Sequence, residues 1–250
     1  MKKHYWLLFV LSMSLFATHL TAQTSNERMS YPVSNKTDSS DNYFGTVVTD
    51  PYRWMENDRS PEVAQWVKDQ NTFTTSFLHK IPFREAVKNR ITELANYPKY
   101  GPPIHAGDYY IYAKNTGLQN QSIYYYQKGL TGAEQVFLDP NKLSQDGTAA
   151  VSLLGVSKDK KYLAYAINQS GSDWQTIHVI EIATAHQLDD NLEWVKFSGA
   201  AWQGDGFYYS RYQHPDDGKE LSGKNEGHEV WFHKLGTKQI EDKMIFILTR

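Results

Sequence analysis

The sequence predicts a mainly β fold, an incomplete β-propeller of about three blades that follows an N-terminal α-helical segment. From residue 104 onward, short aromatic segments alternate with turns rich in Gly, Asn, Asp and Ser, which is typical of antiparallel strands. The sequence also repeats, because "GVSKDKKYLAYAIN" matches "AAWQGDGFYYSRYQ" and places Tyr162 and Tyr208 46 residues apart. A four-stranded unit that recurs every ~40 to 50 residues is typical of propeller blades.

The same pattern occurs once more around Tyr110, 52 residues before Tyr162. Three matching units predict blades at about residues 104–150, 151–193 and 194–243, and a plain β-sandwich with aromatic strands is the alternative. Closed propellers have roughly four to eight blades. Three blades cannot close a ring, so we expect two blade faces without a neighbour and an architecture that is unfinished at the end of the chain.

An N-terminal segment of residues 23–103, with two expected helices, precedes the incomplete propeller of residues 104–250. Residues 23–41 are polar, and we expect them to form a flexible lead-in. Ser60 is a favourable N-cap, and Pro61 suits the first helical position. Apolar side chains then recur at helical spacing. They are Val63, Trp66, Val67 and Phe77 in the first helix, with Gln70 and Thr74 as weaker members, and Phe83, Val87, Ile91 and Leu94 in a second helix expected from Pro82.

Residues 1–22 have the pattern of a cleavable signal peptide. Lys2 and Lys3 precede an apolar run of about 13 residues, and small or apolar residues lead up to a cleavage site after Ala22. A membrane anchor is the alternative, but a helix needs about 20 apolar residues to span a bilayer. We therefore expect an exported protein, either periplasmic or secreted. The chain has no cysteine, which excludes disulfides, a lipoprotein anchor and thiolate metal sites.

The charge of the chain gives no reason to expect a nucleic acid or an anionic membrane as a partner. There are 26 Lys and Arg residues against 28 Asp and Glu residues, for a formal net charge of -2. Such partners select for clustered positive charge. The aromatic content of 14%, with 17 tyrosines, instead favours strands.

No serine has the sequence context of a nucleophile. A hydrolase elbow requires G-x-S-x-G, whereas Ser157 lies in "GVSKD" and Ser172 in "GSDW". Ser157 and Lys160 have the S-x-x-K spacing of some acylating enzymes, but that chemistry needs a helix, and the context here is a turn that enters a strand. We predict no catalytic residue in this chain and interpret both serines as turn residues.

The histidines do not have the spacing of a metal site. H-E-x-x-H is absent, and His228 and His233 flank "EVWF", so that we expect them on opposite faces of a strand. The remaining candidates are scattered: His105, His178, His186 and His214. Phosphate-binding glycine loops are absent too. The sequence therefore predicts neither a metal nor a cofactor.

Acidic residues at three places in the sequence are candidate functional groups. The pairs Asp189–Asp190 and Asp216–Asp217 lie in polar stretches, and we expect solvated turn residues, since acid–base work needs burial to shift a carboxyl pKa. Asp173 and Trp174 could line a substrate site. The structural interpretation, which we favour, is a turn in which Asp173 accepts backbone N–H bonds and Trp174 packs between blades.

Several strings taken together resemble the prolyl oligopeptidase family over about residues 31–243. They are "DPYRWMEN", "WVKDQN", "YPKYGPP", "GLQNQSIYYY", "FLDPNKLSQDGT", "SGSDW", "LEWVKFSGAAW" and "HKLGTKQIEDK". "GLQNQS" and "SGSDW" favour prolyl oligopeptidase over its basic-residue-cleaving relative. The resemblance implies a seven-bladed propeller that caps an α/β-hydrolase domain with a Ser-Asp-His triad. It places that triad after the propeller, so about three of seven blades are present and the hydrolase domain is absent.

The resemblance also implies a role for the N-terminal helices. In the family this segment packs on the hydrolase domain, so we expect Trp54, Trp66, Phe73 and Phe77 to form a docking face. The predicted function is that of the N-terminal fragment of an exported serine peptidase, inactive by itself, whose complete form cleaves short proline-containing peptides. The expected partner of the fragment is the missing hydrolase domain. A non-catalytic binding module and a non-functional truncated remnant are the alternatives.

Overall fold

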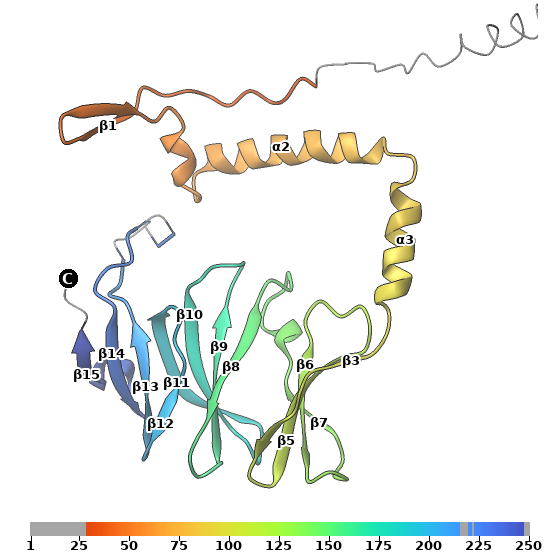
Figure 1. Ribbon diagram of the computed structural model, residues 1–250, viewed down its shortest axis with the longest axis vertical. Coiled ribbons are helices and arrows are strands. Elements are labelled where there is room, and N and C mark those ends of the chain that lie inside the picture. The colour runs from red at the N-terminus through yellow and green to blue at the C-terminus, as the bar shows by residue number, and fades with distance from the viewer. Residues whose placement is uncertain (1–28, 216–219, 222, 248–250) are drawn as a thin grey trace, which may run out of the picture.

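The computed structural model describes residues 29–215, 220–221 and 223–247 (Figure 1). The predicted signal peptide, residues 1–22, lies outside the described residues. The same is true of Asp216 and Asp217. Among the described residues, no helix is long and apolar enough to cross a membrane.

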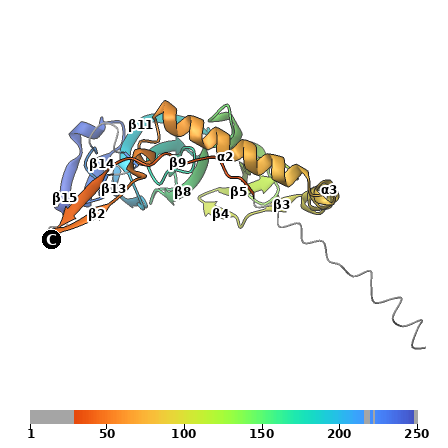
Figure 2. The same cartoon turned by 90° about the horizontal axis from the view of Figure 1, so that it is seen from above.

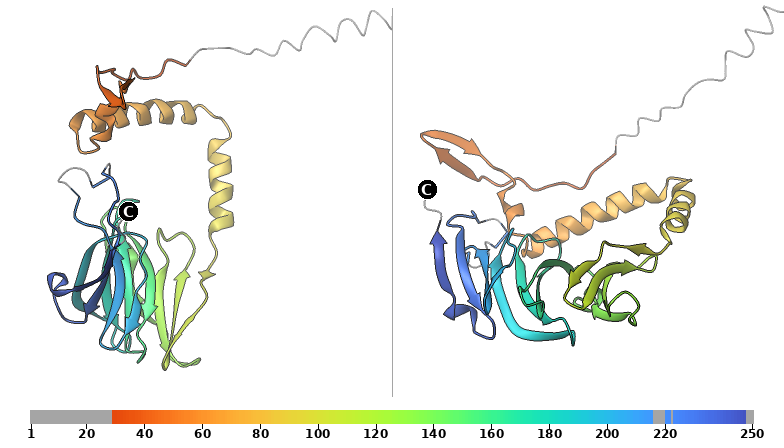
Figure 3. Two further views of the ribbon diagram at one scale, coloured as in Figure 1. Left: turned by 60° about the vertical axis from the view of Figure 1, so that its left-hand side comes forward. Right: turned by 60° about the horizontal axis from the view of Figure 1, so that its bottom comes forward.

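Three antiparallel sheets lie side by side in the order of the chain (Figures 1 and 3). The first contains β3 (Lys99–Tyr100), β4 (Ile104–Ala106), β5 (Tyr109–Asn115), β6 (Ile123–Lys128) and β7 (Gln135–Leu138), in the order β3-β5-β6-β7 with β4 paired to β5. The second contains β8 (Ala150–Val156), β9 (Tyr162–Asn168), β10 (Gln175–Glu181) and β11 (His186–Val195). The third contains β12 (Ala201–Gln203), β13 (Gly206–Arg211), β14 (Glu229–Lys234) and β15 (Lys243–Ile247).

In the second and third sheets each strand pairs with the next strand along the chain, which is the order of a propeller blade. Tyr162 starts β9, and Tyr208 lies in β13, the second strand of its own sheet. Tyr110 lies in β5, the first long strand of the first sheet. The prediction of three blades in a ring that does not close is therefore confirmed, and the repeat of aromatic strands marks equivalent strands.

Adjacent blades bury the core between their facing sheets. Strand β9 shows how, because its side chains alternate between the two faces of the second sheet. Leu163 and Tyr165 pack toward the first blade with Ile111 and Phe137. The small residues of the opposite face pack toward the third blade. They are Ala164 and Ala166, which contribute to a cluster with Trp202 and Phe207.

The second and third blades approach most closely at Gly155. The indole Nε1 of Trp202 donates a hydrogen bond to the carbonyl oxygen of Gly155 at 3.0 Å. A Cβ atom at Gly155 would lie 2.8 Å from the carbonyl oxygen of Ala200, a distance that side chains do not tolerate. Glycine is therefore required here by the backbone of the neighbouring blade.

The N-terminal segment forms an arm outside the sheets. It contains the hairpin β1 (Ser40–Tyr43) and β2 (Thr46–Thr49), the 3₁₀ turn η1 (Arg53–Glu56), and the helices α2 (Pro61–His79) and α3 (Arg84–Ala95). The side chain of Ser60 accepts hydrogen bonds from the backbone N–H groups of Glu62 and Val63, so the predicted N-cap is confirmed. Seen from above, α2 extends to the side of the first sheet, where α3 leads into β3 (Figure 2). Helix α3 begins two residues later than predicted, with Phe83 as its N-cap.

The lead-in covers one face of α2, which its polar composition did not indicate. Trp66 donates from Nε1 to Ser34 Oγ at 2.9 Å, and Trp54 donates to the backbone oxygen of Asn35 at 2.9 Å. The rings of Tyr31 and Phe73 have centroids 4.8 Å apart. From residue 29 on, the predicted flexible lead-in is therefore packed against the helix. Much of the expected docking face is covered by the chain itself.

Replacing Gly155 with alanine tests the close contact between blades. Gly155→Ala should lower the free energy of unfolding by about 1–3 kcal/mol, the usual cost of overpacking, because the backbone of the third blade must move. Gly199→Ala is the matched control, since a Cβ there meets no atom within 4 Å. Urea unfolding of the two variants measures the difference. Equal stabilities would show that the blades do not depend on this approach.

Candidate functional site

The loops that join the blades gather at one end of the sheets. Because the strands are antiparallel, the β9–β10 turn, the β11–β12 connection and the β13–β14 loop emerge at the same end, while the β8–β9 turn with Ser157 lies at the other. An ion pair of 3.2 Å between Arg59 and Glu220 joins the N-terminal arm to the β13–β14 loop. We define this end as the loop end of the blades.

Aromatic rings of the second and third blades form a cluster at the loop end. Trp174 packs edge-on against Trp194 at 5.5 Å and against Tyr212 at 6.3 Å between ring centroids. Tyr212 stacks on His228 at 4.5 Å. His214 lies 4.1 Å from Trp194. The cluster fixes the loops of two blades against each other, as the structural interpretation of Trp174 expected.

A buried cation and two hydrogen bonds, one to a side chain and one to the backbone, complete this cluster. Lys196 is 7% exposed, and its Nζ lies 3.9 Å from the centroid of the Trp174 ring. The same Nζ donates to Asn225 Oδ1 at 3.0 Å. The indole of Trp174 donates to the backbone oxygen of Glu220 at 2.5 Å. A desolvated cation over an aromatic face contributes about 2 kcal/mol, so Lys196 stabilises the fold of the β13–β14 loop on the second blade.

Phe197 is the most exposed aromatic side chain of this end. It is 76% exposed and has a φ of 52°, and Trp194 nearby has a φ of 60°. Positive φ is costly for large side chains and persists where the surrounding structure imposes it. The β11–β12 connection therefore presents an apolar ring to solvent on a constrained backbone, which makes Phe197 a candidate contact for a ligand or a neighbouring domain.

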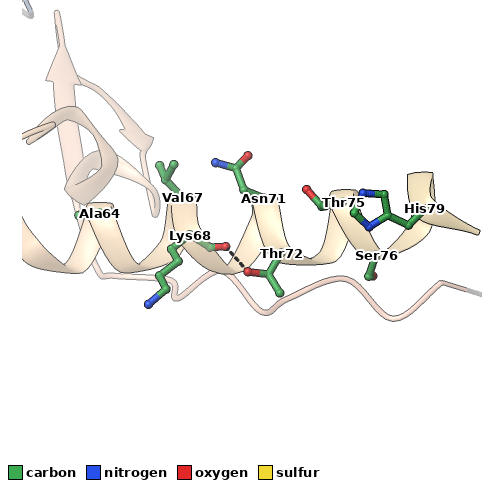
Figure 4. Close-up of a pocket in the computed structure, with 8 residues that line it drawn as sticks. All are labelled: Ala64, Val67, Lys68, Asn71, Thr72, Thr75, Ser76 and His79. Atoms are coloured by element: carbon green, nitrogen blue, oxygen red, sulfur yellow. Dashed lines mark hydrogen bonds between the residues drawn. The ribbon is translucent and has the colours of Figure 1, made fainter. Parts of the chain in front are cut away.

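Two surfaces adjoin the loop end. One hollow is lined by Glu56 of the arm together with the third-blade residues Tyr212, His214 and Lys224 and with Trp174. The other is the open side of α2, where Val67, Asn71 and Thr75 project together from the helix and Thr72 donates to the backbone oxygen of Lys68 (Figure 4). Both surfaces mix polar and apolar groups.

The two candidate serines have structural roles. Ser157 is 3% exposed, donates to Asp159 Oδ1 at 2.7 Å, and accepts from the backbone of Tyr162 at 2.9 Å. Lys160 meets Ser157 through the backbone alone, because its N–H donates to the Ser157 carbonyl oxygen at 3.0 Å in a turn where Lys160 has a φ of 64°. Ser172 accepts the backbone N–H of Trp174 at 3.1 Å, the role that had been expected of Asp173. Among the described residues, no hydrogen bond joins a serine or threonine hydroxyl to a histidine ring.

The histidines do not converge on one site. His105, His178 and His186 lie on strands of the first two blades, and His214 and His228 belong to the aromatic cluster. Within the described ranges, no three His, Asp or Glu residues could hold a metal ion together. Burial lowers the pKa of His178. His233 is fully buried in β14, away from the cluster.

The expectation for Asp190 is wrong. We expected a solvated turn residue, but Asp190 is 2% exposed and lies within β11, where Nε2 of His233 contacts its Oδ1 at 2.8 Å. Its neighbour Asp189 is exposed, as expected. The partner of Asp190 is 43 residues away, so no local pattern signals the burial.

Sequence patterns did not predict most of the loop-end cluster either. Trp194 and Lys196 lie where β11 ends, Tyr212 and His228 lie in the β13–β14 loop, and the blade packing brings these two segments together with Trp174. The one sequence feature that pointed to the cluster was the tryptophan and lysine of "LEWVKFSG", which lie close to a turn between two strands. Spacing alone could not have shown that these residues share one end of the sheets.

The fold and the loop end define a class of protein: an open β-propeller segment carrying an N-terminal helical arm. A family model described as the N-terminal β-propeller domain of prolyl oligopeptidase matches residues 31–249. The chain therefore belongs to the prolyl oligopeptidase family.

Individual relatives agree with this assignment. A prolyl endopeptidase from Elizabethkingia meningoseptica is 44% identical over 227 residues, which cover 90% of this chain and 32% of that protein. A solved prolyl endopeptidase structure matches with a TM-score of 0.75 at 32% identity, over 88% of this chain and 33% of that one. Prolyl oligopeptidase B from Galerina marginata, bound to a 25mer macrocyclization substrate, matches with a TM-score of 0.71 at 29% identity, over 88% of this chain and 34% of that one. The chain thus spans about a third of the length of these relatives.

The ion pair between the arm and the third blade should contribute little to stability. A double-mutant cycle of Arg59→Ala and Glu220→Ala should give a coupling energy of about 0.2–1 kcal/mol, because the arginine side chain is 66% exposed. The coupling should weaken in 1 M salt, where surface charges are screened. Urea unfolding of the four proteins measures it. A coupling of several kcal/mol that survives salt would contradict this assignment.

Proposed function

We propose that this chain serves as the first blades and N-terminal arm of an exported prolyl oligopeptidase-type serine peptidase. The complete enzyme would cleave short peptides after proline through an acyl-enzyme. The observation that carries the proposal is the 44% identity with a prolyl endopeptidase, which extends over both the arm and the blades. In this proposal the chain by itself is inactive, since none of the described serines is positioned as a nucleophile.

The proposed partner is an α/β-hydrolase domain of the prolyl oligopeptidase type. The arm exposes apolar side chains to solvent. Exposed apolar patches of this kind mark surfaces that bind another protein. On α3, Phe83, Val87, Ile91 and Leu94 are between 48% and 65% exposed. On the hairpin, four apolar side chains are at least 48% exposed: Tyr43, Phe44, Val47 and Val48.

Export is part of the same proposal. It is supported by the basic and then apolar sequence of residues 1–22. Expression of the chain in a Gram-negative host, followed by cell fractionation and N-terminal sequencing, checks it. The expected product lies outside the cytoplasm and begins at Gln23. A cytoplasmic product that retains Met1 would contradict it.

A hybrid enzyme tests the proposed function. The aligned part of the Elizabethkingia meningoseptica enzyme is replaced by residues 31–247 of this chain, and hydrolysis of a proline-linked chromogenic peptide is measured. The hybrid should turn over the substrate and be blocked by a serine-directed inhibitor, while the purified 250-residue chain shows no turnover. Turnover by the chain alone, or a folded but inactive hybrid, would overturn the proposal.

A pair of hybrid variants examines the docking surface. Ile91→Glu combined with Leu94→Glu places charges on the apolar face of α3, and the hybrid should lose its activity or its stability. Lys88→Ser combined with Glu93→Ser changes charged residues of the same helix and is the matched control. Both pairs are exposed, so the isolated chain should fold in either case. Equal activity of the two hybrids would exclude this face as the docking surface.

A further inference from the structure

The second and third blades share a buried cluster of charged side chains. His233 lies on β14 of the third blade with no exposed surface. Its Nε2 is 2.8 Å from Oδ1 of Asp190, which belongs to β11 of the second blade. Its Nδ1 is 2.7 Å from Oδ1 of Asp242, which lies between the 3₁₀ turn η3 (Gln239–Glu241) and β15. One imidazole ring therefore bridges two blades.

The contacts fix the protonation of the ring. An ionised carboxylate only accepts hydrogen bonds, and a neutral imidazole donates from one nitrogen alone. Both nitrogens of His233 face a carboxylate oxygen, so both must carry a proton. A neutral ring would direct a nitrogen lone pair at Asp190 or at Asp242. With both carboxylates ionised, the geometry is satisfied only by the imidazolium form.

The remaining contacts of the two carboxylates are few. The backbone N–H of Gly236 donates to Asp190 Oδ1 at 2.8 Å, and Tyr209 donates from Oη to Asp242 Oδ2 at 2.7 Å. Oδ2 of Asp190 is buried and has no hydrogen-bond partner among the described atoms. The side chains of His233, Asp190 and Asp242 are 0–1% exposed. Two carboxylates in such a place need the positive charge of the ring between them.

Among the described residues, no other charged side chain has a hydrogen bond or ion pair with the ring. The hydroxyl of Tyr209, on β13, is a further titratable group that contacts Asp242. The other charged groups on the packed elements lie at the surface or bond elsewhere. They are Asp189 and Glu193 on β11, Asp205 before β13, Arg211 on β13, Glu229 and Lys234 on β14, Glu241 in η3 and Lys243 on β15; the buried Glu229 accepts hydrogen bonds from Gln213 and Trp231.

The direction of the pKa shifts agrees with the contacts. Burial alone would lower the pKa of His233, but the hydrogen bonds and charges of Asp190 and Asp242 outweigh it and raise the pKa to about 9. Burial is the largest influence on Asp190 and would raise its pKa, but the hydrogen bonds from His233 and the Gly236 backbone, together with the charge of His233, outweigh burial and hold the pKa below its ordinary value.

We propose that Asp190, His233 and Asp242 form a proton-operated latch between the second and third blades, closed by the imidazolium form and released when the ring loses a proton. A histidine with a raised folded-state pKa stabilises the fold fully below its unfolded-state pKa of 6.5, and this stability is lost as the pH rises through about 9. The latch is therefore closed at neutral pH and opens in alkali.

Urea unfolding between pH 6 and pH 10 provides the first test. In the wild-type chain, the unfolding equilibrium constant should rise on the order of 100-fold across this range through the latch. His233→Gln should abolish this dependence, because an amide donates a hydrogen bond but gains no charge. His178→Gln is the matched control, since His178 is a partly buried histidine without a carboxylate partner, and it should keep the wild-type dependence. A steep alkaline loss that persists in His233→Gln overturns the latch.

NMR titration of the imidazole ring carbons supplies a measurement that needs no destabilised variant. The His233 ring in the wild-type chain should titrate near pH 9, and Asp190→Asn should move this value toward 6.5. A wild-type His233 that titrates at or below 6.5 would refute the proposal, whatever the variants do.

Distances between spin labels distinguish a latch from a merely buried ion pair. The chain has no native cysteine, so labels can be placed at Thr184→Cys on the second blade and Lys238→Cys on the third. Between pH 7 and pH 10 the distance distribution of this pair should broaden. The control pair, Leu130→Cys with Thr184→Cys, joins the first and second blades and should not change. No change in the first pair, or an equal change in both, would contradict the latch.

Discussion

The packing of one sheet face against the next is the interaction on which this structure depends. A single four-stranded blade cannot bury both of its faces, so each blade is stable only between neighbours. The second blade meets this condition, because β10 sends Ile177 and Val179 toward the third blade and Ile180 toward the first. The first and third blades are covered by a neighbouring blade on one face only. The other face of each of these two blades therefore remains without a neighbouring blade.

The uncovered surface lies where a continuation of the architecture would meet it. All five residues of the edge strand β15 are exposed, and among them are Met244, Ile245 and Phe246. The arm adds the apolar face of α3. The relatives that match this chain are about three times as long. The arm is held meanwhile by its own lead-in, through tryptophan hydrogen bonds to Ser34 and Asn35.

Polar groups determine how the blades are joined at each end. At the loop end, Lys196 and Trp174 fix a connection of the third blade onto the second. Deeper in the same junction, His233 lies between two carboxylates. A buried ion cluster of this kind adds less net stability than apolar packing would, but it accepts only one register of the partners. The blade junction therefore combines nonspecific apolar area with polar contacts that specify the alignment.

The sequence by itself determined the local elements. Strand alternation and the Ser60 cap depend on residues a few positions apart, and the repeat of Tyr110, Tyr162 and Tyr208 is a regular spacing along the chain; the structure bears all three out. Tertiary structure alone decided which distant residues meet. The burial of Asp190 depends on His233, 43 residues away, and the cover of Trp66 depends on Ser34, 32 residues away. Periodicity reports which face of a strand or helix is apolar, whereas the partner of that face is fixed only when whole sheets pack.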